Sequence, residues 1–249
     1  MAKRAESGLL ENIKTIVYAG LIAIGIRTVG FEPFNIPSGS MIPTLLVGDY
    51  LFVSKYSYGY SHYSLPFSPP LFSGRIFGRD PQRGDVAVFK WPRDNKTDYI
   101  KRIIGLPGDR VQMLGGQLHI NGKVVPRESA DPITTRDELG IRMQGRRYVE
   151  TLPGGVKHDI QKLTDDSTAN NTVEFKIPAD HVFAMGDNRD NSSDSRFAVE
   201  SGGVGMVPLE NLVGRAEFIF FSIDAEYQWW EFWMWPYEIR WSRIFSGIH

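Results

Sequence analysis

Residues 98–125 read DYIKRIIGLPGDRVQMLGGQLHINGKVV, and this stretch decides the fold. Gly115–Gly116 and Asn121–Gly122 separate the short alternating segments VQML, QLHI and KVV. Paired glycines and Asn-Gly adopt the positive φ angles of two-residue hairpin turns, so the pattern predicts consecutive β-hairpins. Further short apolar runs lie at Tyr50–Val53 and Val86–Phe89, without long helical periodicity. The sequence therefore predicts a mainly β protein.

The composition limits the class of protein. A chain of 249 residues is long enough for one compact body with an inserted lobe. Hydrophobic residues make up 42% and charged residues 23%, which excludes wholesale disorder and a multi-span membrane protein. The formal net charge of −1 gives no electrostatic basis for binding nucleic acid, so we expect no such partner. The absence of cysteine excludes disulfides and a thiol nucleophile.

The N-terminal segment differs from the rest because Thr15–Ile26 is apolar and free of charge. These residues span only about 18 Å as a helix, less than the roughly 30 Å of a bilayer core, so length alone favours a core helix or a signal-peptide segment. However, Lys14 and Arg27 flank the run and can reach the two interfaces, and no A-x-A-like cleavage site follows it. We therefore predict one uncleaved transmembrane anchor over residues 13–31.

The basic residues around this anchor predict its orientation. Lys3, Arg4 and Lys14 precede the apolar run, whereas only Arg27 lies near its far end. Basic residues concentrate on the cytoplasmic side of a membrane helix. Residues 1–12 are therefore expected in the cytoplasm and the remaining body on the extracytoplasmic face.

The remaining chain divides by composition. Residues 126–173 are polar, are interrupted by Pro, Gly and Asp, and carry only weak strand signals near Tyr148 and Val173. We assign them to an inserted, peripheral lobe. The β-rich main domain then comprises residues 32–125 and 174–249.

The C-terminal stretch 218–245 holds five of the six tryptophans. Trp229, Trp230 and Trp233 stand among charged residues, a pattern typical of indole rings at the headgroup level of a bilayer. We predict a patch that rests on membrane lipids. A packed aromatic cluster in the core or between domains is the alternative.

Three segments combine residue types that suit nucleophilic catalysis. In residues 34–45 (FNIPSGSMIPTL), two serines lie among a glycine and two prolines, which fix an extended and then a tight backbone. A serine on such a turn can act as a nucleophile, while a second hydroxyl and backbone N–H groups stabilise an oxyanion. An ordinary turn after the anchor is the alternative.

A serine nucleophile needs a base, and only His181 among the five histidines lies near another of these segments. In the second segment, 98–109, Lys101 instead interrupts an apolar, β-like run. A solvated lysine is the simplest interpretation, but burial would lower the pKa of its amine and make it a general base. The third segment, 185–196 (MGDNRDNSSDSR), predicts either a solvated loop or a hydrogen-bonded scaffold for that lysine.

Four segments in this order, 32–59, 83–92, 98–109 and 185–196, resemble the bacterial type I signal peptidases. Members of this family are membrane-anchored Ser–Lys endopeptidases that release signal peptides from exported preproteins. The resemblance implies that Ser40 is the nucleophile and Lys101 the general base. The remaining implied roles are an oxyanion hole formed by the Ser38 hydroxyl and the Ser40 N–H, a lysine-orienting contact from Ser192, and support of the loop by Asp194 and Arg196.

The resemblance also implies a specificity. Substrates of the family carry small side chains at the first and third positions before the cut, commonly Ala-X-Ala. The residues expected to line the two shallow apolar pockets are Phe34, Ile36, Met41, Leu45, Val88 and Ile100. Their apolar walls would also desolvate Lys101. The reaction requires no metal ion or cofactor.

The implied setting is the bacterial plasma membrane, crossed once, with the catalytic domain on the periplasmic side close to the export translocon. A relative specialised for one conjugation or secretion substrate would carry the same motifs. Related self-cleaving repressors carry a DNA-binding domain where this chain has an apolar segment. An anchored, non-enzymatic envelope-binding module is the third alternative, and it would leave the serines and Lys101 as coincidences.

Overall fold

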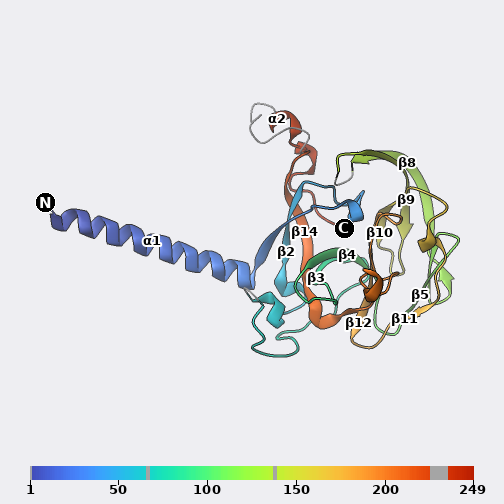
Figure 1. The fold of residues 1–249 in the computed structure, drawn as a ribbon, viewed down its shortest axis with the longest axis horizontal. Coiled ribbons are helices and arrows are strands. Elements are labelled where there is room, and N and C mark those ends of the chain that lie inside the picture. Colours follow the sequence, from blue (N-terminus) through green and yellow to red (C-terminus); the bar gives the residue numbers. More distant parts are fainter. Residues whose placement is uncertain (1, 66–67, 137–138, 225–234) are drawn as a thin grey trace.

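The computed structural model describes residues 2–65, 68–136, 139–224 and 235–249. A single long helix, α1 (Ala2–Val29), projects from a β-rich body (Figure 1). The described strands of this body form three antiparallel sheets. The predicted class, a mainly β fold preceded by one apolar helix, is confirmed.

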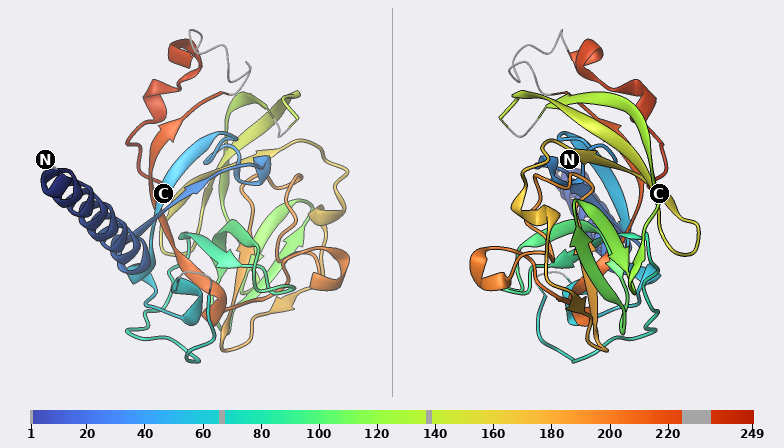
Figure 2. Two further views of the ribbon diagram at one scale, coloured as in Figure 1. Left: turned by 60° about the vertical axis from the view of Figure 1, so that its left-hand side comes forward. Right: turned by 90° about the vertical axis from the view of Figure 1, so that its right-hand side faces the viewer.

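The largest sheet has seven strands in the order β1-β2-β14-β3-β4-β12-β13. Their bounds are β1 (Phe31–Asn35), β2 (Asp49–Ser54), β14 (Leu212–Ser222), β3 (Val86–Lys90), β4 (Asp98–Gly105), β12 (His181–Met185) and β13 (Val207–Pro208). Register shifts along β14 mark β-bulges, which increase the local twist and help the sheet to curl (Figure 2). The last long strand of the chain therefore lies in the middle of the sheet, between β2 and β3.

Among the described strands, β1 and the first half of β4 each have an open edge. Strand β12 pairs with β4 only between Arg102 and Gly105, so the first half of β4, residues 98–101, has one free edge. Strand β1 pairs with β2 on one side and has no neighbour on the other among the described strands. An open edge presents unpaired backbone N–H and C=O groups to which an extended peptide can bind.

The four-stranded sheet contains the hairpins that the sequence predicted. Its strands, in the order β11-β5-β6-β7, are β11 (Phe175–Lys176), β5 (Arg110–Leu114), β6 (Gln117–Ile120) and β7 (Lys123–Val124). Gly115 and Gly116 turn the chain between β5 and β6 with φ angles of 55° and 72°. Asn121 and Gly122 do so between β6 and β7 with φ angles of 53° and 76°. Both predicted turns are confirmed.

All three strands of the third sheet, in the order β10-β9-β8, lie in the segment assigned to a lobe. Its strands are β8 (Arg127–Arg136), β9 (Arg142–Thr151) and β10 (Lys157–Lys162), and the long β8–β9 pair curves along one side of the body (Figure 2). The strand signal at Tyr148 is confirmed, because Tyr148 lies in β9. The signal at Val173 is displaced, since β11 begins two residues later at Phe175.

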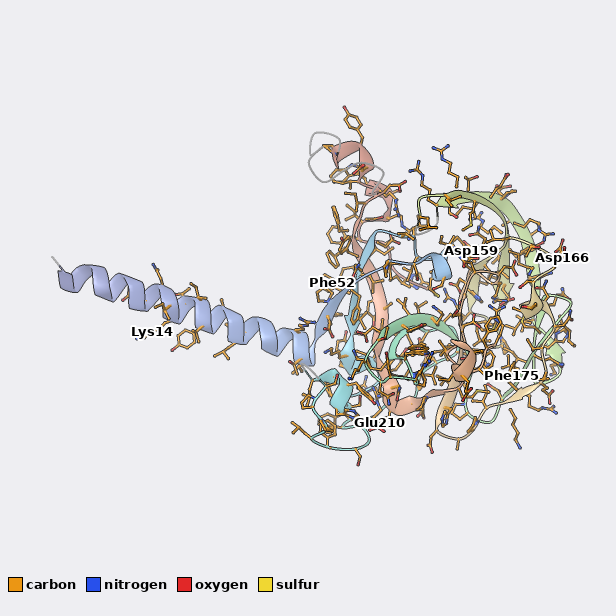
Figure 3. The ribbon with its side chains drawn as sticks, in the orientation of Figure 1. Lys14, Phe52, Asp159, Asp166, Phe175 and Glu210 are labelled. Atoms are coloured by element: carbon orange, nitrogen blue, oxygen red, sulfur yellow. The ribbon has the colours of Figure 1, made fainter. Side chains whose placement is uncertain are left out.

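Within α1, residues Glu11–Val29 are long and apolar enough to cross a membrane, with a mean hydropathy of 1.3 and no burial against the body. Exposed apolar side chains include Ile16, Leu21 and Ile22. Lys14 lies on the part of α1 that extends away from the body (Figure 3). The helix ends at Val29, and Phe31 already pairs with Ser54 in the sheet, so the predicted segment 13–31 includes the first residue of β1.

Only part of the aromatic C-terminal stretch is described. Trp229, Trp230 and Trp233 lie outside the described residues, whereas Trp241 is exposed. Phe218 and Phe220 of β14 pack against Phe52 of β2 with ring centroids 5.4 and 4.5 Å apart. At least this part of the stretch therefore forms an aromatic cluster on the sheet.

Candidate active site

The two residues expected to form the catalytic dyad lie in contact. Ser40 belongs to a short 3-10 helix, Gly39–Met41, that follows β1, and Lys101 lies in β4. The Lys101 Nζ is 2.7 Å from the Ser40 Oγ and also donates a hydrogen bond of 2.9 Å to the Ile100 carbonyl. Both residues are buried, with 9% exposure for Ser40 and 3% for Lys101. The site therefore pairs a hydroxyl with an amine that is largely excluded from water.

Burial changes the acid–base chemistry of Lys101. Loss of solvation lowers the pKa of the Lys101 amine to about 8, although the Asp194 and Asp187 carboxylates oppose this shift. A lysine with such a pKa is partly neutral near pH 7, and the neutral amine can accept the proton of a hydroxyl. The geometry and the pKa together suit a nucleophile–base pair.

The hydroxyl expected in the oxyanion hole is close to the dyad. Ser38 is exposed, and its Oγ lies 3.5 Å from the Ser40 Oγ. Ser38 thus stands beside Ser40 at the rim of the site.

Ser192 does not make its predicted contact. Its buried Oγ has no hydrogen-bond partner among the described residues, and the Ile100 carbonyl holds the Lys101 amine instead. A Cβ atom added at Gly186 would lie 2.2 Å from the Ser192 Oγ and 2.4 Å from the Ser40 carbonyl oxygen. Ser192 therefore packs beside the backbone of Ser40, in a space that only glycine at position 186 leaves open.

The loop 185–196 holds the serine turn in place. The Asn188 backbone N–H donates to the Ser40 carbonyl at 3.1 Å, and its side-chain amide donates to the Gly39 carbonyl at 3.0 Å. Asp194 accepts from the Gly186 N–H at 3.0 Å and forms a buried ion pair of 2.8 Å with Arg196. The predicted pairing of Asp194 with Arg196 is thus present in the structure.

A buried ion pair next to Lys101 fixes the same loop to the sheet. The Arg102 guanidinium and the Asp187 carboxylate are 2.7 Å apart and almost fully excluded from water. Asp187 also accepts a hydrogen bond of 2.5 Å from the Thr44 hydroxyl, just beyond the serine turn. Burial raises the pKa of the Asp187 carboxyl, but the Arg102 charge outweighs this effect and keeps the pKa below its ordinary value.

Strands β9 and β10 of the segment assigned to a lobe contact the loop 185–196. Backbone hydrogen bonds of 2.9 Å join Gln161 of β10 to Asp187 and Arg189 of the loop. The Arg189 guanidinium forms two hydrogen bonds with the Glu150 carboxylate of β9, at 2.9 and 2.5 Å, with both side chains buried. Glu150 and Arg189 are distant along the chain, so no local sequence pattern predicts their contact.

A cavity of about 480 Å³ opens beside the dyad. It lies between the open edges of β1 and β4, and its walls include Phe34, Ile36, Val88 and Ile100, as the sequence predicted. Asp98 and Tyr99 also line it, and the prediction missed both.

The prediction that Met41 and Leu45 line this cavity is wrong. Both side chains have 0% exposure and belong to the apolar cluster that supports Ile36 and Val88 from behind. The 3-10 turn that presents the Ser40 hydroxyl to the cavity turns the next side chain, Met41, into the core.

Comparison with known proteins identifies the family of this chain. A family model described as signal peptidase, peptidase S26, matches residues 9–221. The signal peptidase I of Rickettsia typhi is 40% identical over 96% of this chain and 94% of its own length, and that of Rickettsia conorii is 41% identical over 92% and 89%. A signal peptidase I of known structure from Enterococcus faecalis is 24% identical and covers 55% of this chain and 97% of its own, at a TM-score of 0.32.

These matches first define the class of protein, a hydrolase of the serine endopeptidase type. Within that class, the chain belongs to the signal peptidase family, peptidase S26. The family that the four segments predicted is therefore confirmed.

Proposed function

We propose that the protein is a membrane-anchored endopeptidase that removes signal peptides from exported preproteins with a Ser40–Lys101 dyad. The observation that carries this proposal is the 2.7 Å contact between the Lys101 Nζ and the Ser40 Oγ in a buried site beside a cavity. Ser40 and Lys101 contact one another rather than solvent, as the nucleophile and the base do in Ser–Lys enzymes.

The chemistry follows from the order of proton transfers. Neutral Lys101 accepts the Ser40 proton while the Ser40 Oγ forms a bond to the scissile carbonyl carbon. The Ser38 hydroxyl and the Ser40 N–H stabilise the resulting oxyanion. The peptide C–N bond then breaks as Lys101 returns the proton to the leaving nitrogen. A water molecule, deprotonated by Lys101, then attacks the ester carbon, the C–O bond to Ser40 breaks, and Lys101 returns the proton to the Ser40 Oγ.

The open strand edges explain how a substrate would bind. A peptide lying between β1 and the first half of β4 can form backbone hydrogen bonds with both edges and add a strand to the sheet. Alternate side chains of that peptide would face the wall formed by Phe34, Ile36 and Ile100. Such a wall suits small apolar side chains at the first and third positions before the cut.

The apolar helix supports a place at the membrane. We assign α1 to a single span with the N-terminus in the cytoplasm, because basic residues precede it. The body then lies on the periplasmic side, near the translocon from which preproteins emerge, with the aromatic C-terminal segment against lipid. A relative specialised for one substrate would share this arrangement and differ only in the range of preproteins that it cleaves.

The test is direct. The full chain, purified in detergent, is mixed with a preprotein that carries an Ala-X-Ala site, and the product masses are measured. Cleavage after the second alanine is expected for the unaltered chain and is expected to disappear in Ser40→Ala and Lys101→Ala. Ser129→Ala and Lys176→Ala, which alter an exposed serine and an exposed lysine of other sheets, are the matched controls and should retain activity. A fully active Lys101→Ala variant would refute the dyad.

A further inference from the structure

A second cavity adjoins the first on the side of α1. Its volume is about 160 Å³, and it shares Phe34 and Asp98 with the cavity beside Ser40. Its other walls include Arg27, Glu32, Lys55 and Lys90. The first cavity thus continues into a smaller space, and half of the residues that line this space are charged.

Along β1, β3 and β4, the side chains that line the two cavities change from apolar to charged within two residues. On β3 and β4, Val88 pairs with Ile100, and two residues further on Lys90 pairs with Asp98. On β1, Glu32 and Phe34 are two residues apart, and Ile36 follows directly after the strand. Side chains two apart in a strand point to the same face. The charged cavity therefore lies one side-chain step beyond the apolar one on the same face.

The charges in this cavity are not balanced. The Glu32 carboxylate binds Lys55 at 2.8 Å and Arg27 at 2.6 Å, and Asp98 binds Lys90 at 2.9 Å. Three cations thus face two carboxylates. Lys55 is almost fully buried and also donates to the Ser64 carbonyl, so its charge is fixed beside the cavity. Because of this excess of one positive charge, the cavity favours a bound group that is a hydrogen-bond acceptor or an anion over one that is a cation.

We propose that the second cavity is a substrate subsite for the fifth residue before the cleaved bond, selective for a side chain with an acceptor oxygen. This inference rests on the proposed function. In an extended peptide, side chains on one face recur every second residue, at about 6.6–6.8 Å. If the first and third residues before the bond face the apolar wall, then the fifth falls at the cavity formed by Glu32, Lys90 and Asp98. A carboxylate or carboxamide there is favoured, whereas lysine is disfavoured.

The experiment uses soluble peptides that share one Ala-X-Ala site and differ only in Glu, Gln, Leu or Lys at the fifth position. The measured quantity is kcat/KM for each peptide with the full chain in detergent. We expect the Glu peptide to exceed the Lys peptide about fivefold, the size typical of a partly solvated ion pair. The Leu peptide should lie between them.

The Lys90→Glu variant gives the cavity an excess of negative charge and should invert the Glu-to-Lys ratio. Lys90→Gln is the milder variant and should bring the ratio close to one. Arg110→Glu changes the net charge by the same amount as Lys90→Glu, but at an exposed site of β5. This control should leave the Glu-to-Lys ratio as in the unaltered chain. Each ratio compares two substrates of one enzyme, so a general loss of activity cancels.

Equal rates for all four peptides in the unaltered chain would overturn the subsite while the peptidase assignment stands. An unchanged ratio in both Lys90 variants would do the same. If none of the peptides, nor a full preprotein, is cleaved, the proposed function fails and the subsite fails with it.

Discussion

Lys101 shows how a single residue acquires its chemistry from its surroundings. Lys101 is the last residue of the half of β4 that has an open edge, and its amine lies against Ser40. The apolar wall formed by Val88 and Ile100 keeps water away. Burial lowers the pKa of the amine to about 8, while the nearby carboxylates of Asp187 and Asp194 limit that change. The same wall that would select small substrate side chains therefore also prepares the base.

This pKa predicts the pH dependence of cleavage. Only the neutral amine accepts the Ser40 proton, so kcat/KM for an Ala-X-Ala peptide should rise about tenfold per pH unit below the pKa and level off above about 8. Measurement between about pH 5.5 and 10.5 checks this, with Lys176→Ala as the control that should keep the same midpoint. A midpoint near 10.4, the ordinary value for lysine, would contradict the role of burial.

At the scale of elements, the β9–β10 hairpin acts as a support for the loop 185–196. The buried pair of Glu150 and Arg189 crosses between the two, and the neighbouring His158 side chain is fully enclosed. The His158 Nε2 lies 3.5 Å from Glu150 and 3.9 Å from Asp187, close to the Arg102 and Arg189 cations. The support therefore contains a titratable group in a site with no access to water.

The enclosed histidine predicts a loss of stability in acid. Burial and the Arg102 charge lower the pKa of His158 to about 4, below its ordinary value of about 6.5. The unfolded chain therefore binds the proton first, and the free energy of unfolding should fall as the pH drops from 6.5 towards 4. The expected loss is about 2 kcal/mol at pH 5 relative to pH 7.5.

Denaturant titrations of the full chain at both pH values measure this loss. The His158→Gln variant should lack it, whereas His119→Gln, a change in the four-stranded sheet, should behave as the unaltered chain does. An equal pH dependence in all three proteins would assign the effect to other groups.

The elements differ in how far the sequence predicts them. The turns at Gly115–Gly116 and Asn121–Gly122 were predicted because turn chemistry is local. The insertion of β14 between β2 and β3 was not predicted, and neither was the contact of Glu150 with Arg189. Both join residues that are distant along the chain and depend on tertiary packing. For the site, the segments predicted the contact of Ser40 with Lys101, but residue types alone did not distinguish the wall from the core behind it, as Met41 and Leu45 show.

On the scale of the whole molecule, α1 and an aromatic sheet face lie on the same side. Phe52 is placed on the side of the body from which α1 extends (Figure 3). Its ring packs against Phe31 and Phe220, and the exposed rings of Tyr50 and Tyr56 extend the cluster. Aromatic rings favour the interface of a bilayer. If α1 spans the membrane, this face is the part of the body that meets the lipid headgroups.

This arrangement predicts a difference between membrane-bound and soluble substrates. Replacement of both exposed rings, Tyr50→Gln with Tyr56→Gln, should lower the cleavage rate of a preprotein embedded in vesicles about threefold to tenfold, because each ring contributes about 1 kcal/mol or less to seating at the interface. The rate on a soluble Ala-X-Ala peptide should stay within a factor of two. Val173→Gln, an exposed apolar residue elsewhere on the body, is the control. Equal losses on both substrates would indicate damage to the fold instead.

The central position of β14 has a consequence for the time at which activity begins. Ser40 follows β1, Lys101 lies in β4, and Leu212–Ser222 forms the strand that links these two halves of the sheet. While the chain is being synthesised, α1 and both members of the dyad emerge long before this strand does. The ribosome must therefore synthesise the chain past residue 222 before the complete sheet can bring Ser40 and Lys101 together. If these two residues form the dyad, the nascent chain cannot cleave other proteins until then.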